Sequence, residues 1–382
     1  MKIVIAPDSY KESLTALEVA THIEAGFREI FPDACYVKLP VADGGEGTVE
    51  AMVAATNGEI IEGDVTGPLG DPIHSFYGIS GDRQQVFIEM AAASGLEQVP
   101  AELRNPMKTT SWGTGELIRC ALDSGVQSIL IGIGGSATND GGIGMVQALG
   151  ARLLDSEGEP LGMGGGEVAR LASIDISGLD ARLKACRIEV ACDVTNVLTG
   201  EKGASAVFGP QKGATPEMVS QLDQALEHYA KIISHDLGID VMTLSGGGAA
   251  GGMGAALFAF CGAELQQGIE IVTRALKLDE LVRDADLVIT GEGRIDSQSI
   301  HGKVPIGVAK VAKRYNKPVI GIAGSLTPDV GVVHQHGLDA VFSVLYRICS
   351  LEDALENTGE NLRMAARNIA ATIAIGGGCR LR

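Results

Sequence analysis

The beginning of the chain alternates between short apolar runs and segments whose apolar residues recur at helical spacing. Residues 2–6 (KIVIA) form a partly β-branched run that predicts a buried strand. Residues 15–31 carry one apolar stripe behind a capping-box sequence, which predicts a helix. The runs YVKLPVA and VEAMVAAT repeat this order. Two successive strand–loop–helix units are typical of a parallel α/β sheet.

The same alternation returns near the end of the chain. Apolar runs predict three further strands, at 286–290, 317–324 and 339–345. A helical pattern separates the first two of them, and residues 351–375 predict one long final helix. Both ends of the chain therefore have the periodicity of one parallel sheet covered by helices.

The middle of the chain has a different pattern, with a long amphipathic helix, two glycine-rich loops and the shorter strand candidates IHSFYGI, QVFIEM, SILIGI and RIEVAC. We therefore expect an α/β protein in which residues 1–65 and 281–382 form a Rossmann- or flavodoxin-like parallel-sheet domain. Residues 66–280 would form a second α/β domain inserted into it. Ligands favour the carboxyl ends of parallel strands and the clefts between domains, so we expect the active site in the cleft between these two.

Composition and charge narrow the function classes. The 382 residues carry a formal net charge of −18, which argues against non-specific binding to nucleic acid or an anionic membrane. The apolar stretch before Pro7 is too short for a signal peptide, and residues 246–260 are too few and too rich in glycine for a membrane span. The seven cysteines form no CxxC pair, so we expect reduced thiols in a cytoplasmic protein; they lie at 35, 120, 186, 192, 261, 349 and 379.

The segment GIGGSATNDGGIG at 132–144 has glycine at six of its thirteen positions, directly after the apolar run SILI. Glycine is expected where the backbone needs a positive φ or must come close to a ligand, and a loop that serves close packing is the structural alternative. Ser136, Thr138, Asn139 and Asp140 add hydroxyl, amide and carboxylate groups. This mixture suits phosphate oxygens and Mg²⁺.

We compared the sequence with two known nucleotide-binding motifs. Residues 132–137 match the short dinucleotide fingerprint G-x-G-x-x-A, and Asp155 lies near the expected acidic position. An NAD-dependent dehydrogenase therefore stays open as an alternative. The sequence contains no Walker A motif, because the one Gly-Lys pair, at 302–303, is followed by Val304.

Four other loops place an acidic residue within two positions of the end of an expected strand, namely Asp8, Asp43, Asp193 and Glu292. Each alone is also an ordinary helix cap or turn residue. Clustered carboxylates, however, repel one another unless a cation or a proton relieves them, which favours a Mg²⁺–phosphate site. Cations able to stabilise a transferring phosphoryl group lie in similar loops, namely Lys11, Lys212 and Lys303.

These loop motifs resemble those of the bacterial glycerate kinase type 1 family. The matching segments keep the family's order over most of the chain: APDSYKESLTA, PVADGGEGT, GIGGSATNDGG, ACDVTN, FGPQKGAT, GGGAAGGMGAAL, TGEGRIDSQS and GKVPIGVA. The resemblance implies ATP-dependent phosphorylation of D-glycerate, with 2-phosphoglycerate as the product in glyoxylate and aldarate breakdown. It also implies a Rossmann-like domain that carries an inserted second domain.

The expected site residues follow from the loop chemistry and this resemblance. Asp193 or Asp296 would orient the attacking hydroxyl, and Lys11 and Lys303 would contact phosphate or the glycerate carboxylate. The candidates for binding ATP are Gly134, Gly135, Ser136, Thr138, Asn139 and Lys212. The candidates for binding substrate are Asp8, Ser9, Asp43, Asn196, Glu292 and Arg294. The candidates for holding Mg²⁺ are Asp43 and Glu46.

Three rival interpretations remain at the level of sequence: a kinase for another small hydroxy acid, the NAD-dependent dehydrogenase, and an acidic anion-binding sensor that consumes no ATP. The residues leave open which hydroxyl is phosphorylated, which loop binds ATP and which binds glycerate, and which group is the catalytic base. The expected partner is a small-molecule substrate, with no nucleic acid and no membrane. A homodimer is a candidate assembly.

Overall fold

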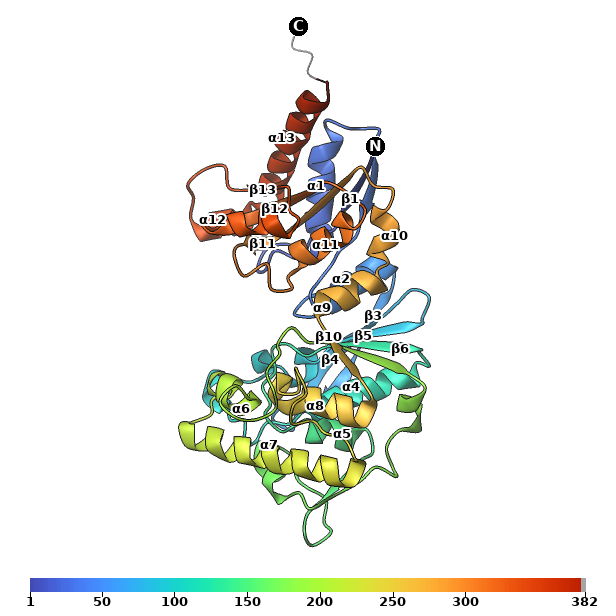
Figure 1. The fold of residues 1–382 in the computed structure, drawn as a ribbon, viewed down its shortest axis with the longest axis vertical. Coiled ribbons are helices and arrows are strands. Elements are labelled where there is room, and N and C mark those ends of the chain that lie inside the picture. Colours follow the sequence, from blue (N-terminus) through green and yellow to red (C-terminus); the bar gives the residue numbers. More distant parts are fainter. Residues whose placement is uncertain (379–382) are drawn as a thin grey trace. The chain divides into compact units, whose positions relative to one another are not determined.

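Five parallel strands form the sheet of the first of two units into which the chain divides (Figure 1). The computed structural model describes residues 1–378. Unit 1 comprises Met1–Asp43, Glu50–Asn57 and the described part of Ile269–Arg382. Unit 2 comprises Gly44–Val49 and Gly58–Gly268.

The sheet of unit 1 has the strand order β13-β12-β11-β1-β2. Its strands are β1 (Lys2–Ile5), β2 (Cys35–Lys38), β11 (Leu287–Ile295), β12 (Val319–Leu326) and β13 (Ala340–Ser343), all paired in parallel. The chain moves outward from β1 to β2, enters again at β11 and then moves outward in the opposite direction. The strand order therefore reverses between β1 and β11, and doubly wound sheets bind ligands at such a switch point.

The apolar stripe that predicts the first helix is buried in unit 1. Helix α1 (Ala16–Arg28) begins after Thr15, whose Oγ1 accepts the Glu18 N–H at 3.3 Å while Glu18 Oε2 accepts the Thr15 N–H at 2.9 Å. The predicted capping box is thus confirmed. Phe27 of this helix is fully buried in the core cluster that α1 shares with α13 (Thr358–Gly378).

The predicted long final helix is instead two helices. Asn357 leaves helical geometry (φ −100°, ψ 13°) after α12 (Leu351–Glu356) and separates it from α13. The helices α2 and α9 each begin in unit 2 and lie mostly in unit 1. The further helices with residues in unit 1 are α2 (Thr48–Thr56), α9 (Gly268–Ala275), α10 (Leu278–Val282), α11 (Val304–Lys313), η6 (Val330–His336) and α12 (Leu351–Glu356).

The sheet of unit 2 has the strand order β10-β9-β6-β5-β4-β3. Strands β5, β6, β9 and β10 pair in parallel, whereas β3 and β4 add an antiparallel hairpin. The four strand candidates from the sequence are confirmed as β4, β5, β6 and β9. The bounds are β3 (Glu59–Thr66), β4 (Pro72–Ile79), β5 (Gln85–Glu89), β6 (Ser128–Gly132), β9 (Arg187–Ala191) and β10 (Glu264–Gln266), with a separate pair, β7 (Arg152–Leu154) and β8 (Ser173–Asp175).

The long amphipathic helix of the middle region is confirmed as α7 (Pro216–Leu237), which Thr215 caps by accepting the Met218 N–H. Its neighbour α8 (Ala249–Cys261) begins with backbone in left-handed conformation at Ala250. The other helices are α3 (Ala91–Ser94), α4 (Trp112–Asp123), α5 (Ile143–Ala148), α6 (Ala204–Phe208), η1 (Leu96–Gln98), η2 (Ala101–Leu103), η3 (Gly165–Arg170), η4 (Ala181–Lys184) and η5 (Pro210–Lys212).

The boundaries of the two units differ from the predicted ones. Residues 44–49 and 58–65 lie in unit 2; the second range includes most of β3, which pairs along its whole length with β4. Residues 269–280 lie in unit 1, where the side chain of Ile269 fills the space beside Gly307 of α11. The sequence pattern around residue 60 carries no strand signal, since most of its side chains are exposed.

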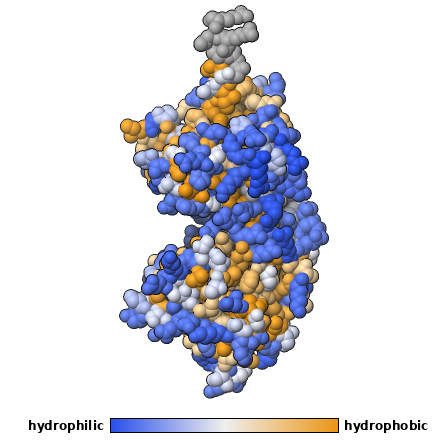
Figure 2. Space-filling model, viewed as in Figure 1, coloured by the Kyte–Doolittle hydropathy of each residue, from blue (hydrophilic) through white to orange (hydrophobic). Residues whose placement is uncertain are grey.

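The face of unit 1 in view is mostly hydrophilic, with one hydrophobic projection over the segment between β13 and α12 (Figure 2). Tyr346, Ile348 and Leu351 are exposed there. No helix in residues 1–378 is long and apolar enough to cross a membrane. The cysteines within this range are free thiols, and Cys379 lies outside the described residues.

Candidate active site

Two carboxyl groups of unit 1 lie at the switch point of its sheet. Asp8 follows β1 and donates its backbone N–H to the carbonyl of Gly291, at 2.8 Å. Glu292, the next residue of β11, therefore lies beside Asp8; β11 extends to Ile295, so Glu292 lies within the strand and not in the predicted loop after it. Asp43, which follows β2, is close enough for its charge to act on both. The structure thus brings three of the predicted substrate-binding acids together.

These acids differ in how their charge is compensated. Burial raises the pKa of Asp8 to about 8, and the charges of Asp43 and Glu292 add to this, while the Ser9 N–H at 2.7 Å and Lys303 oppose it. Burial also raises the pKa of Glu292, although Ser299 Oγ donates to its Oε1 at 2.6 Å. Lys303 Nζ lies 3.5 Å from Glu292 Oε2. Lys303 thus opposes the raised pKa of both Asp8 and Glu292.

A cation that enters with a phosphate group suits this cluster. Carboxylate oxygens are hard ligands, and Mg²⁺ commonly takes one or two of them together with phosphate oxygens and water. Within residues 1–378, no group of three or more His, Cys, Asp or Glu side chains is arranged to hold a metal ion by itself. The residues present thus fit Mg²⁺ bound jointly with a nucleotide, rather than a site built from protein ligands alone. Asp43 lies in unit 1 and Glu46 in unit 2, so this predicted pair stays a prediction.

The other predicted residues of unit 1 lie in the turn after β1 and at or just beyond the end of β11. Lys11 is exposed in the turn after β1. Arg294 Nε lies 3.3 Å from Asp296 Oδ2, and Asp296 Oδ1 accepts the Gln298 N–H at 2.8 Å. Asp296 therefore stabilises its own turn in this structure, and its catalytic role stays a prediction.

In unit 2, the glycine-rich loop after β6 combines packing with exposure. A Cβ on Gly132 would lie 2.1 Å from the carbonyl oxygen of Gly44, and one on Gly142 would lie 2.6 Å from Ala256 Cβ, so both positions require glycine for close packing. Gly134 and Gly135 are exposed instead, and Gly135 has a φ of +75°. The close-packing alternative explains part of the loop, and the exposed edge is where a ligand can approach.

Three of the residues predicted to bind ATP are buried, two of them within this loop and the third, Lys212, beneath it. Lys212 is 1% exposed, and its Nζ donates to Ser136 Oγ and to the Thr138 carbonyl, both at 2.7 Å. Thr138 and Asn139 are fully buried, and Asn139 Nδ2 donates to Ser205 Oγ at 3.0 Å. Burial lowers the pKa of Lys212 to about 7. These side chains support the loop from inside.

Asp140 anchors the same loop from its other end. Its Oδ2 accepts the N–H of Ser111 at 2.9 Å and the Ser111 hydroxyl at 2.7 Å, and its Oδ1 accepts the Gly142 N–H at 3.0 Å. Burial nevertheless raises the pKa of Asp140. A fully buried carboxylate with this many donors fixes the course of residues 140–144.

The two predicted site residues after β9 also hold backbone in place. Asp193 Oδ1 accepts the Gly268 N–H at 3.0 Å, and Asn196 Nδ2 donates to the Lys202 carbonyl at 2.8 Å. Asp193 is exposed, so its carboxylate is accessible to a ligand as well. Its predicted role in orienting a hydroxyl stays a prediction.

Sequence reasoning missed several supporting hydroxyl groups. Ser299 and Tyr10 lie inside the motif segments 290–299 and 6–16, and Tyr10 donates its buried hydroxyl to the Ile322 carbonyl at 2.7 Å. Their position inside these motif segments is the sequence feature that could have indicated a role for them in the site. Ser111 and Ser205 are far in sequence from the loop that they support, so no local pattern indicates them.

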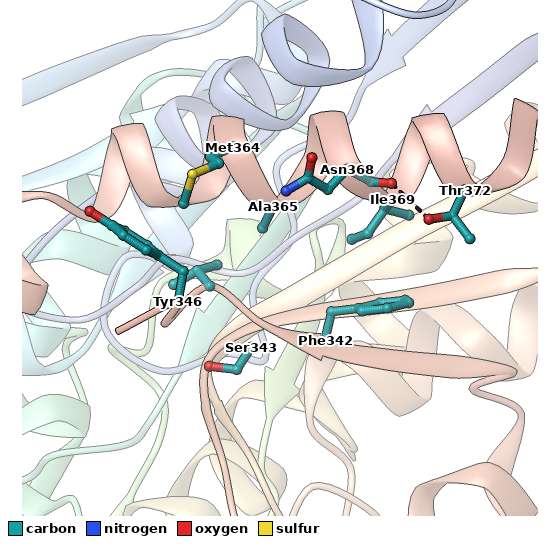
Figure 3. A pocket seen from close by; sticks show the side chains of 9 residues that line it. Phe342, Ser343, Tyr346, Met364, Ala365, Asn368, Ile369 and Thr372 are labelled. Carbon is teal, nitrogen blue, oxygen red and sulfur yellow. Dashed lines mark hydrogen bonds between the residues drawn. The ribbon is translucent and has the colours of Figure 1, made fainter. Parts of the chain in front are cut away.

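A pocket of about 220 Å³ lies between β13 and α13 in unit 1 (Figure 3). The side chains that line it include none with a charge: Phe342, Ser343, Val344, Tyr346, Met364, Ala365, Asn368, Ile369 and Thr372. It is therefore suited to apolar or uncharged groups and contributes nothing to a phosphate site.

Comparisons with known proteins identify the family of this chain. The family model described as the glycerate kinase family matches residues 3–374. The chain is 68% identical to the glycerate 2-kinase of Escherichia coli strain K12, over 98% of this chain and 99% of that protein. It is 60% identical to the glycerate kinase of Bacillus subtilis strain 168, over 98% of each chain. A crystal structure from Salmonella typhimurium LT2 that carries the provisional name glycerate kinase 2 is 72% identical, with a TM-score of 0.93 over 99% of both chains. The chain therefore belongs to the glycerate kinase family.

Proposed function

We propose that this protein transfers the γ-phosphoryl group of ATP to a hydroxyl group of D-glycerate and that the product is 2-phosphoglycerate. The names of the relatives support the reaction class, and the name of the Escherichia coli enzyme supports phosphorylation of the 2-hydroxyl. This reaction would belong to glyoxylate and aldarate breakdown in the cytoplasm.

The observation that carries the proposal is the acid cluster of unit 1. Asp8, Asp43 and Glu292 lie at the switch point of a doubly wound sheet, with Lys303 beside them. D-glycerate offers two hydroxyl groups that can donate hydrogen bonds to such carboxylates. Charge compensation by a cation that accompanies ATP would then relieve their mutual repulsion.

In the proposed reaction, an oxygen–phosphorus bond forms at the glycerate hydroxyl, and the bond between the γ-phosphorus and the ADP oxygen breaks. The hydroxyl proton passes to a carboxylate, for which Asp193 and Asp296 are the candidates. Lys303 and Lys11 would balance the charge of the transferring group. When bound, Mg²⁺ would neutralise and orient the phosphate oxygens.

A turnover assay with a panel of acceptors tests this proposal. Purified protein with ATP and Mg²⁺ should release ADP with D-glycerate, and tartronate, lactate and glycerol should be poor acceptors. ADP release with another acid of the panel and not with D-glycerate would move the assignment to a different hydroxy-acid kinase. A fluorescence titration with NADH tests the dehydrogenase alternative, and sedimentation of the purified protein tests the homodimer.

A further inference from the structure

We propose that the exposed edge Gly134–Ser136 of the glycine-rich loop is a binding subsite for an oxyanion and that Lys212 is its positioning residue. Lys212 would act through Ser136, by holding and polarising the hydroxyl that meets the anion. This inference rests on the proposed function, in which the oxyanion is either the carboxylate of glycerate or a phosphate group of ATP.

The direction of the hydrogen bonds gives Ser136 its role. When Lys212 is charged, its ammonium can only donate, so Ser136 Oγ accepts from Nζ at 2.7 Å, and the Ser136 proton is directed elsewhere. Within residues 1–378, the structure shows no acceptor for this hydroxyl proton. Ser136 is 6% exposed and adjoins two exposed glycines, so the proton can reach a ligand at the surface. A hydroxyl that accepts from an ammonium is a stronger donor.

The backbone beside Ser136 adds further donors. In the described part of the chain, the N–H groups of Gly134 and Gly135 donate to no backbone carbonyl. The carbonyl of Gly135, in contrast, accepts the Leu96 N–H at 2.8 Å, which fixes the peptide group between Gly135 and Ser136. Exposed N–H groups together with a polarised hydroxyl are the donors that bind carboxylate or phosphate oxygens.

The burial of Lys212 supports a specific role, since a buried ammonium has a large desolvation cost. The charged group that faces it is Asp140 of the same loop, whose carboxylate already accepts from Ser111 and Gly142. The nearby titratable group on α7 is Tyr229, whose buried hydroxyl lies in the field of Asp140. Lys212 is thus only partly compensated, and an anion bound at Ser136 would stabilise its charged form.

This leads to a proton-linked test. Because burial lowers the pKa of Lys212 to about 7, a large share of the free protein carries neutral Lys212 at pH 8. A bound anion raises the pKa of Lys212, so binding at pH 8 takes up protons. The uptake is measured by calorimetric titration in two buffers with different ionisation enthalpies. The probes are D-glycerate and Mg²⁺–AMPPNP, each alone and in the presence of the other.

We expect proton uptake with one of the two probes, and that probe identifies the oxyanion. Ser136→Ala and Lys212→Met should each weaken binding of the same probe by about tenfold, and Lys212→Met should abolish the uptake. The matched control is Thr109→Val, which removes a buried hydroxyl that donates to the Ala137 carbonyl of the same loop at 2.9 Å. This variant should leave the dissociation constants of both probes unchanged.

Unchanged binding of both probes to Ser136→Ala would overturn the inference, and so would equal losses in Ser136→Ala and Thr109→Val. Should Lys212→Met fail to fold, Ser136→Ala alone decides.

The wild-type turnover assay separates this inference from the proposed function. A wild-type protein that phosphorylates D-glycerate while Ser136→Ala keeps both KM values refutes only the subsite. An inactive wild-type protein that still binds an oxyanion through Ser136 refutes only the proposed function.

Discussion

Replacing Asp8 by asparagine should stabilise the metal-free protein at neutral and alkaline pH. The pKa of this carboxyl rises from 3.8 to about 8 on folding, so the folded state holds its proton over a range where the unfolded chain has lost it. Stability therefore falls as the pH rises above 3.8, and the penalty is complete above pH 8. Asparagine cannot ionise and keeps an oxygen that can accept the Ser9 N–H.

The size of the effect follows from the shift. At pH 7, the interval above the unfolded pKa of 3.8 covers about three units. At 1.36 kcal/mol per unit, this lowers the free energy of unfolding by ~4 kcal/mol. Asp8 is only partly buried by surface area, so water and small movements of Asp43 and Glu292 relieve part of this cost. We expect about 2 kcal/mol, which corresponds to roughly 4–8 °C in Tm for a domain of this class.

The assay is thermal unfolding by calorimetry at pH 4.5 and at pH 8, with EDTA present. The gain in Tm of Asp8→Asn over the wild type should be small at pH 4.5 and largest at pH 8. Asp296→Asn is the matched control, because this carboxylate is paired with Arg294 in the same unit and should give no such gain. A Tm for Asp8→Asn below that of the wild type at pH 8 would refute the reasoning. A gain in Tm of equal size at both pH values would refute it as well.

Three further variants test other parts of the structure. Ser299→Ala removes a buried donor to Glu292 and should cost about 2 kcal/mol in denaturant unfolding; no loss would show that the carboxyl does not depend on this bond. Thr15→Ala removes the cap of α1 and should cost about 1 kcal/mol, whereas a change below ~0.3 kcal/mol would contradict the capping box. Asp193→Asn should lower kcat at least tenfold if its carboxylate orients the hydroxyl, and full turnover with the fold intact would exclude that role.

Much of the fold follows from periodicity because the relevant signals are local. The run at 2–6 and the stripe of α1 depend on neighbours within a few residues, and both form as expected. The switch point could also be anticipated, since the strands that flank it come from opposite ends of the chain. In contrast, β3 is mostly exposed and carries no apolar alternation, so only its pairing with β4 defines it.

The candidate site was less accessible to sequence reasoning, because the same residue types serve ligands and loops. Asp8 follows β1 as expected, whereas β11 continues through Glu292, and the two acids do meet, as parallel topology requires. Thr138 and Asn139 look like ligand-binding residues in the sequence and are fully buried in the structure. Lys212 lies 74 residues from Thr138, and only the fold brings its ammonium beneath the loop. Such long-range contacts determine whether a side chain is available to bind a ligand or instead holds a loop in place.

The position of the phosphate on the product tests the central claim most directly. Phosphorus NMR of the protein with ATP, Mg²⁺ and D-glycerate should show a new phosphomonoester signal split into a doublet, because the phosphate of 2-phosphoglycerate is attached to a CH group. A triplet would mean phosphorylation of the CH₂ hydroxyl and would contradict the proposed product. With the fold intact and Mg²⁺ present, no new signal would contradict the proposed activity itself.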